Sequence, residues 1–239
     1  MKKWRLIFLP LLFLVAGCDE LKNLGGTVED YMQPSTSEMV MALKQALETG
    51  TGRAVEELNQ QDGYFGDAAV KILFPPEAQK VANTLRDIGA GKIVDDFVLS
   101  LNRAAEDAAK EAGPIFVNAV KQMTIADARN ILLGADDAAT EYFRSKTRQQ
   151  LYNSFQPKIK SALDRSYATK YWKDITTRYN QLPGVQDVNA DLPNYAADRA
   201  LDGLFLKLKD EEEKIRDNPA ARTTEVMKEV FSWAKREKG

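Results

Sequence analysis

Residues 94–110, VDDFVLSLNRAAEDAAK, form the most strongly helical stretch of the sequence. On a helical wheel its apolar side chains share one broad face: Val94, Phe97, Val98, Leu101, Ala104, Ala105 and Ala108. The opposite face carries Asn102, Arg103, Glu106 and Lys110. This pattern predicts a helix whose apolar face packs into the core, with alanines that let a neighbouring helix approach closely.

The sequence on both sides of this stretch has the same helical periodicity. Ser37 is the expected N-cap of a first helix that extends to Leu58, with a kink or break at Thr49–Gly52. Asp62–Gly66 is expected to form a turn, and Val70–Pro76 an extended segment. Further helices are expected at 77–88, 114–123, 125–133, 137–163, 167–182 and 194–217, and a last helix is expected after an N-cap at Asn218. Pro157 should kink the 137–163 helix or divide it in two.

The composition favours the same fold class. Alanine is abundant and runs of β-branched residues are scarce. We therefore predict an all-α fold, a multi-helix globular bundle with at most one short extended segment or hairpin near residues 68–75. Residues 37–239 are expected to form a single helical domain, and a division into halves at 37–133 and 134–239 is left open. A chain of this length can bury a core without disulfides.

The N-terminus has the pattern of a bacterial lipoprotein signal. Lys2, Lys3 and Arg5 precede an apolar run, Leu6–Val15, which is too short to span a bilayer. Ala16 and Gly17 directly before Cys18 resemble a lipobox. We expect residues 1–17 to be removed as a signal peptide, Cys18 to be lipidated, with palmitate among its acyl chains, and residues 18–36 to form a flexible tether. The alternative is an ordinary signal peptide followed by an unrelated cysteine.

The residues after Cys18 and the net charge bear on location and partners. Asp19 and Glu20 favour retention in the inner membrane, facing the periplasm, over transfer to the outer membrane. The expected partner is therefore the lipid bilayer, through acylated Cys18. Loss of residues 1–17 removes three basic residues and leaves 30 basic and 35 acidic ones. Nucleic-acid binding needs a basic surface, so we predict no nucleic-acid partner.

Histidine is absent from the sequence, and Cys18 is its single cysteine. A chain without histidine cannot build a Ser-His-Asp triad, a Cys-His pair or a histidine-ligated zinc site. Lipidation of Cys18 would also remove thiol catalysis. The sequence has no Asp-x-Asp-x-Asp-Gly loop of the calcium-binding type. We therefore predict no catalytic residue, no cofactor and no metal site, and we lean against an enzyme.

Several motifs occur in an order that is similar to that of one family. They are FVLSLNRAAE at 97–106, PIF at 114–116, MTIADA at 123–128, AATEYF at 138–143, ALDGLF at 200–205 and IRDNPAARTT at 215–224. Together they resemble an uncharacterised family of bacterial envelope proteins and lipoproteins, known as domain of unknown function 4197, over about residues 40–233. The resemblance implies an all-helical domain in the cell envelope and carries no activity with it.

Four polar residues are the candidate binding residues: Asn102, Arg103, Glu106 and Arg222. The first three share the polar face of the 94–110 helix, and Arg222 lies with Thr223 and Thr224 at a helix start, where backbone amides favour an anion. The structural alternative, which we favour, is ion pairing among Arg103, Glu106 and Lys110 on a solvated surface. A buried polar pocket is a further possibility. For three other features we prefer a structural role: Glu211–Glu213 form a solvated face, Gly203 allows close contact with another helix, and Asp136 or Asp137 caps a helix.

A set of aromatic residues could line a groove for a ligand, although we favour packing in the core or at helix edges. These residues are Tyr152, Tyr167, Tyr171, Trp172 and Tyr179.

Three hypotheses for function follow. The favoured one is a noncatalytic, membrane-anchored periplasmic module that binds an envelope protein or other partner. The second is a carrier or sensor of a hydrophobic ligand, which requires an apolar cavity larger than about 300 Å³ between helices. The third is a peptidoglycan-acting hydrolase with a lone glutamate, which requires a deep cleft that holds a desolvated Glu.

Overall fold

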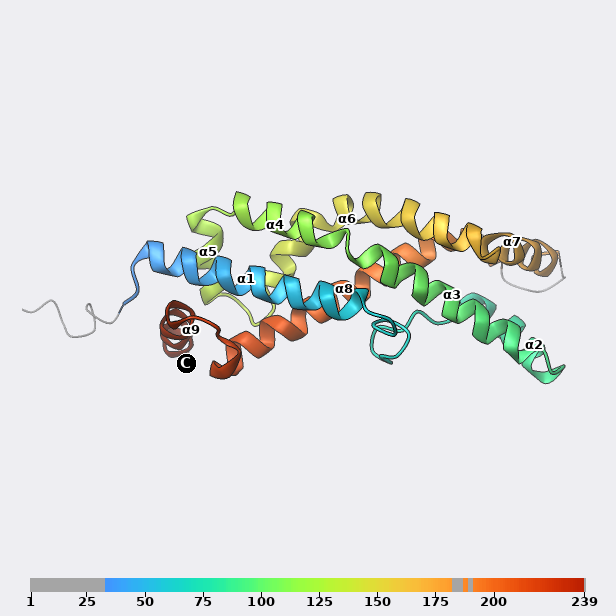
Figure 1. Cartoon of the computed structure of the whole chain (residues 1–239), viewed down its shortest axis with the longest axis horizontal. Helices are drawn as coiled ribbons and strands as arrows, with labels where there is room; N and C mark the ends of the chain where they lie inside the picture. Colours follow the sequence, from blue (N-terminus) through green and yellow to red (C-terminus); the bar gives the residue numbers. More distant parts are fainter. Residues whose placement is uncertain (1–32, 182–186, 189–190, 239) are drawn as a thin grey trace, which may run out of the picture. The chain divides into compact units, whose positions relative to one another are not determined.

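The computed structural model describes residues 33–181, 187–188 and 191–238, and most of these residues are helical (Figure 1). Contacts divide the chain after residue 33, and the second unit, residues 34–239, is compact. The predicted signal peptide, Cys18 and most of the tether lie outside the described residues. The helices of the second unit are α1 (Thr36–Asn59), α2 (Gln79–Asp87), α3 (Gly91–Ala109), α4 (Ala112–Gln122), α5 (Ile125–Leu133), α6 (Ala138–Arg165), α7 (Ala168–Tyr179), α8 (Leu192–Asp217) and α9 (Glu225–Lys238), with short 3-10 turns η3 (Pro76–Ala78) and η4 (Pro219–Ala221).

The core lies between long helices that are distant in sequence. Helix α6 packs on α3 and α8, while α1 packs on α8, α9, α4 and α5. These faces bury large side chains together with many alanines, including Ala104, Ala105 and Ala108 of α3. Small side chains let helix backbones approach closely, as the sequence predicted for this helix. The all-α prediction is confirmed, and the described residues contain no β-strand.

Helix α1 differs from its prediction at two points. Its N-cap is Ser35, whose Oγ accepts a hydrogen bond from Glu38 N while the Glu38 carboxylate accepts one from Ser35 N. This capping box places the helix start before Ser37, inside the segment predicted to be tether. The predicted break at 49–52 is wrong, because α1 continues through Gly50 and Gly52. Gly50 is buried against Glu211 and Ile215 of α8, and this packing offsets its low helix propensity.

The segment between α1 and η3 begins with the predicted turn. The N–H groups of Val70 and Lys71 then donate to Asp67 O in a second turn, so the segment predicted to be extended is irregular and unpaired. Tyr64 is fully buried, and its hydroxyl donates a hydrogen bond to Ala200 O at 2.8 Å. Burial raises the pKa of the Tyr64 phenol above its usual range. Gly203 of α8 lies under this segment, and a Cβ there would come within 2.9 Å of Tyr64 Cε1. The close contact predicted for Gly203 therefore exists, but its partner is a loop and not another helix.

The observed ends of the helices agree in part with the ends predicted from the sequence. Thr124 and Asp127 form the predicted capping box of α5, and Gly134 ends that helix. Pro157 lies within α6, which continues to Arg165 and is not divided. Asn218 does not cap the last helix: its side chain accepts a hydrogen bond from Ala220 N in η4, and Thr224 Oγ1 accepts one from Met227 N at the start of α9.

Candidate functional site

Two of the predicted binding residues hold the 60–75 segment against α3. Asn102 is buried, and its amide accepts a hydrogen bond from Ile72 N and donates one to Ile72 O, both at 2.8 Å. Glu106 is 4% exposed, and its Oε1 accepts hydrogen bonds from the backbone N–H groups of Tyr64 and Phe65 at 3.2 and 3.1 Å. The expectation of a solvated face is therefore wrong for Asn102 and Glu106.

Arg103 completes this contact from the solvent side. Its guanidinium donates to Glu106 Oε2 at 2.6 Å and to Asp62 Oδ1 at 2.7 Å. These hydrogen bonds, outweighing partial burial, raise the pKa of Arg103. Lys110 lies 3.9 Å from Asp107 and takes no part. Because the three candidate residues bind backbone groups, Asp62 and one another, their hydrogen bonds stabilise the 60–75 loop against α3.

Arg222 binds to the C-terminal end of helix α8 and not to the start of a helix. Its guanidinium donates to the carbonyl oxygens of Ile215 at 3.0 Å and Arg216 at 2.7 Å, in the last turn of α8. A third hydrogen bond goes to Ser232 Oγ at 3.0 Å. The residue is 3% exposed, and burial lowers the pKa of its guanidinium. Arg222 therefore caps the C-terminus of α8, and the predicted anion site is not formed by this side chain.

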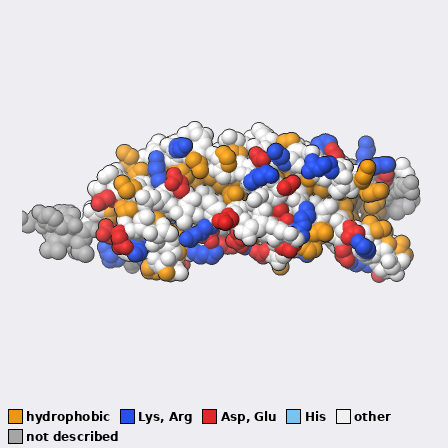
Figure 2. Space-filling model, in the orientation of Figure 1, with side chains coloured by type: hydrophobic (Ala, Val, Ile, Leu, Met, Phe, Trp, Pro, Cys, Tyr) orange, Lys and Arg blue, Asp and Glu red, His pale blue; other side chains and the backbone are white. Residues whose placement is uncertain are grey.

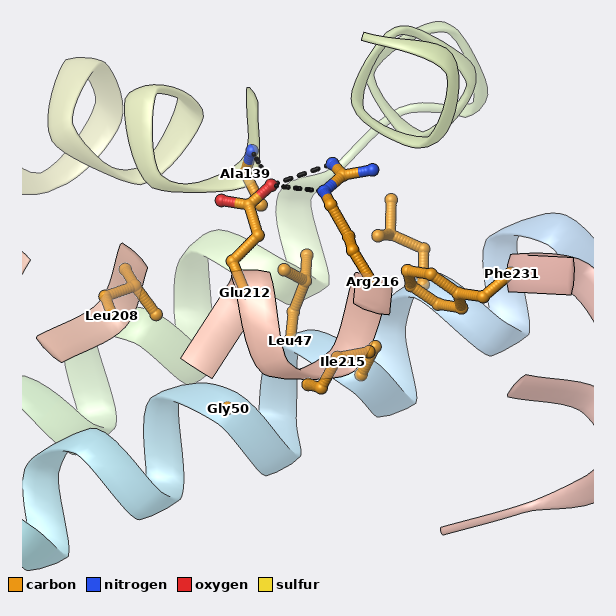
Figure 3. A pocket seen from close by; sticks show the side chains of 10 residues that line it. Leu47, Gly50, Ala139, Leu208, Glu212, Ile215, Arg216 and Phe231 are labelled. Carbon is orange, nitrogen blue, oxygen red and sulfur yellow. Dashed lines mark hydrogen bonds and ion pairs between the residues drawn. The ribbon is translucent and has the colours of Figure 1, made fainter. Parts of the chain in front are cut away.

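Glu212 and Arg216 of α8 form a buried ion pair at 2.7 Å (Figure 3). The Glu212 carboxylate accepts hydrogen bonds from Ala139 N at 2.9 Å and Thr140 N at 2.8 Å, so it caps α6. The adjoining cavity holds about 20 Å³, which is room for a single water. The expectation that Glu211–Glu213 form a solvated face is wrong for Glu211 and Glu212, both of which are buried.

A larger cavity, of about 350 Å³, lies among α2, α3, the start of α7 and the residues before η3. These helices are at the end of the helical unit opposite the start of α1 (Figure 1). The floor consists of three aromatic rings: Phe74 and Phe97 lie 5.0 Å apart, and each lies 5.4 Å from Trp172. Leu85, Ile93, Val94, Ala168, Tyr171 and Ile175 complete its apolar lining. This is the candidate functional site.

Two large apolar side chains are exposed in the lining of this cavity, together with the Asp96 carboxylate. Ile93 is 58% exposed and Tyr171 is 59% exposed, although both line the cavity. Its two serines donate their hydroxyl protons to backbone, Ser100 to Phe97 O and Ser166 to Leu163 O. The Asp96 carboxylate is 2.6 Å from Lys92 Nζ. The cavity therefore offers apolar contact and few free polar groups, an arrangement suited to binding a hydrophobic molecule.

The sequence indicated part of this site. Tyr171 and Trp172 were named for an aromatic groove, and both line the cavity. Tyr152, Tyr167 and Tyr179 of the same set are not among its lining residues. Phe74 and Phe97 were assigned to an extended segment and to a core face, with no indication that they meet Trp172. The missing information was tertiary, since these three rings come from segments far apart in the chain.

Other surface features are less specific. On the face shown in Figure 2, Lys and Arg side chains are interspersed with Asp and Glu. Within the described residues there is no cluster of three or more acidic or cysteine side chains that could hold a metal ion. None of the helices in that same part of the chain is long and apolar enough to cross a membrane.

Comparison with other proteins identifies a family. No curated protein and no solved structure matches this chain. A family described as protein of unknown function (DUF4197) matches residues 33–232, which include every helix from α1 to most of α9. This span agrees with the resemblance found in the order of the sequence motifs. The chain belongs to the DUF4197 family.

Proposed function

We propose that this chain is a lipoprotein, anchored through acylated Cys18 and facing the periplasm, whose helical domain is a noncatalytic module that binds a hydrophobic ligand. The observation that carries the proposal is the cavity of about 350 Å³ with a floor of Phe74, Phe97 and Trp172. Its volume is in the range of about 300–1,000 Å³ that is typical of small-molecule sites.

The lining of the cavity supports an apolar ligand. Phe97 is half-buried and presents part of its ring to the cavity, whereas Phe74 and Trp172 are 5% and 1% exposed and pack beneath it. Displacing water from apolar surface is favourable. Ile93 and Tyr171 expose large apolar side chains at the mouth, where a bound molecule would cover them. The hydroxyl groups of Ser100 and Ser166 already donate hydrogen bonds to backbone carbonyl oxygens. A ligand can therefore bind without offering a hydrogen-bond acceptor to either serine.

Two of the three buried glutamates in the described residues, Glu106 and Glu212, do not favour the hydrolase hypothesis. Glu106 accepts two backbone N–H groups and an Arg103 ion pair, and Glu212 accepts two backbone N–H groups and an Arg216 ion pair. Each of these carboxylates is therefore occupied in holding backbone groups and an arginine, whereas a lone catalytic acid has to face a substrate in a cleft. The membrane anchor is supported by the signal pattern before Cys18 and by Asp19–Glu20, which favour the inner membrane.

A titration with the neutral fluorescent probe N-phenyl-1-naphthylamine tests ligand binding. We expect saturable binding to the processed chain and at least a tenfold loss of affinity in Ile93→Lys, a change of about 1.4 kcal/mol or more. Ile125→Lys is the matched control, since Ile125 is 62% exposed on α5, away from the cavity. Equal affinities in the two variants, or no binding to the wild type, would contradict the proposal.

Labelling of cells with radioactive palmitate tests the anchor. We expect label in the wild type and none in Cys18→Ala, and we expect the labelled protein to fractionate with the inner membrane. Equal labelling of the two proteins would remove the lipoprotein assignment. Recovery of the labelled protein in outer membranes would retain the anchor and overturn the assignment from Asp19 and Glu20.

A further inference from the structure

The apolar cavity has few polar side chains in its lining. Besides the Trp172 indole, which is 1% exposed, they are Asp96, Ser100, Ser166 and Tyr171, and no lysine or arginine is among the lining residues that the structure describes. Both oxygens of Asp96 accept hydrogen bonds from Lys92 Nζ, at 2.8 and 2.6 Å, so this carboxylate and its cation are already paired. A negatively charged ligand would therefore find no unpaired cationic side chain in this lining.

Ser100 is the one of these four polar side chains that is shielded in part from bulk water. The side chain of Asp96 is 60% exposed, Tyr171 is 59% exposed and Ser166 is exposed, whereas Ser100 is half-buried in the middle of α3. A hydrogen bond to a ligand adds little where water can take its place, and it is stronger where the acceptor is partly desolvated. A polar contact with a ligand therefore contributes most at Ser100.

The Ser100 hydroxyl can accept a hydrogen bond, but its proton is already in use. It donates to Phe97 O at 2.7 Å, and no group in the described part of the chain donates to Ser100 Oγ. A hydroxyl oxygen has two acceptor lone pairs, so Ser100 Oγ has acceptor capacity left. To donate to a ligand, Ser100 would first have to give up its hydrogen bond to Phe97 O. The free capacity of this side chain thus matches a hydrogen-bond donor on the ligand.

The position of Ser100 on α3 suits this contact. Ile93, Phe97 and Ser100 all line the cavity, and their spacing of four and three residues places them along one side of the helix. At the usual helical rise, Ser100 lies about 10 Å along α3 from Ile93. Ile93 is 58% exposed, whereas Phe97 and Ser100 are half-buried. A molecule whose apolar body covers Ile93 and Phe97 can therefore bring one end to Ser100.

We propose that the cavity selects an uncharged apolar molecule that carries a hydroxyl or N–H group at one end, and that Ser100 Oγ accepts the hydrogen bond from this group. This inference rests on the proposed function and adds to it the chemical class of the ligand. A carboxylate or phosphate at the same place would lose its hydration and bring acceptor oxygens to an acceptor, with no cation to replace the water. The cavity therefore discriminates against fatty acids and in favour of alcohols.

Displacement of bound N-phenyl-1-naphthylamine by three eight-carbon ligands tests this selectivity. Octanol can donate a hydrogen bond, its isomer methyl heptyl ether can only accept one, and octanoate is ionised at about pH 8. The protein is the processed chain, expressed from residue 18 with Cys18→Ala so that it carries no acyl chain. We expect octanol to bind at least about threefold more tightly than the ether, the effect of one neutral hydrogen bond, and at least about tenfold more tightly than octanoate.

Two serine variants locate the hydrogen bond. We expect Ser100→Ala to lower the affinity for octanol to that for the ether and to leave the affinity for the ether unchanged. Ser166→Ala is the matched control, because Ser166 also lines the cavity and donates to a backbone carbonyl but is exposed to water. It should leave all three affinities as they are in the wild type.

Several results would overturn this inference and leave the proposed apolar site in place. They are equal affinities for octanol and the ether, octanoate binding as tightly as octanol, and an advantage of octanol that survives Ser100→Ala. An equal loss of affinity for octanol and the ether in Ser100→Ala would assign Ser100 to packing and also overturn its role as acceptor. Failure of the fluorescent probe itself to bind would instead contradict the proposed function, on which the inference depends.

Discussion

Asn102 and Glu106 show why a polar side chain on an amphipathic helix is a poor indicator of a ligand site. Both lie on the polar face of α3, and both are buried because the 60–75 segment covers that face. Their partners are 30 to 42 residues away in sequence, so no local pattern indicates the contact. A buried amide or carboxylate needs such partners, because an unpaired one would cost about 1–3 kcal/mol or more.

Gly203 and Gly52 allow a direct test of what a glycine does inside a helix. A Cβ at Gly203 would lie 2.9 Å from Tyr64 Cε1 and 3.1 Å from Val70 Cβ, and neither buried side chain can move away freely. Overpacking costs about 1–3 kcal/mol, which exceeds the gain of about 1 kcal/mol in helix propensity. We expect Gly203→Ala to lower the free energy of unfolding by about 1 kcal/mol, measured by urea denaturation.

Gly52→Ala is the matched control for Gly203→Ala. Gly52 is exposed within α1, and a Cβ there would meet no atom within 4 Å. The alanine should therefore raise the free energy of unfolding by about 0.5–1 kcal/mol through helix propensity alone. If Gly203→Ala also stabilised the protein, the close packing of Tyr64 on α8 would be contradicted.

At the scale of elements, the sequence predicted helix ends well where the capping group is local. Thr124 caps α5 through Asp127, three residues away, and this box was predicted. Ser35 was missed in favour of Ser37, because two serines two positions apart both satisfy the local rule. The start of α6 after Asp137 was predicted correctly, but its capping group was not. Asp137 makes no side-chain cap, and the capping carboxylate belongs to Glu212, 72 and 73 residues away.

This long-range cap makes a prediction about Glu212. Glu212→Gln would leave the Arg216 guanidinium without its ion-pair partner at a site where both side chains are less than 10% exposed. Loss of one member of a buried pair costs about 3–5 kcal/mol. Glutamine can still accept one of the backbone N–H groups of α6, so we expect a loss of about 3 kcal/mol in the free energy of unfolding, measured by urea denaturation.

Glu213→Gln provides the control at the adjacent position. Its carboxylate is 48% exposed and lies 3.7 Å from Lys209, so its removal should change the free energy of unfolding by less than about 0.5 kcal/mol. Similar losses in the two variants would mean that Glu212 contributes no more than a surface charge. The start of α6 would then have to be held by other groups.

At the scale of the whole molecule, the sequence predicted the helices and the class of fold, but only part of the candidate site. Trp172 and Tyr171 were recognised because they are close together in one segment. Phe74, Phe97 and Leu85 join them from three other segments, and the cavity exists only through that packing. Periodicity tells which side of a helix faces inward, and it does not tell which helices leave space between them.

The whole helical unit also makes a prediction about cooperativity. Residues 34–239 form one compact unit, and α1 and α3 on one side of residues 133–134 pack on α8, α9 and α6 on the other. Because these contacts are shared, neither half can lose its structure and leave the core of the other intact. We expect one two-state urea transition for the processed chain.

Two spectroscopic probes can distinguish one cooperative unit from two. Circular dichroism reports on all the helices, whereas the two tryptophans after residue 17, Trp172 and Trp233, both lie in the second half. Coincident transitions by both probes, shifted together by Glu212→Gln, are the expected result. If residues 37–133 and 134–239 unfolded independently, the fluorescence change would follow the second half alone and depart from the change in circular dichroism. The buried contacts between α1 and α8 would then contribute too little to couple them.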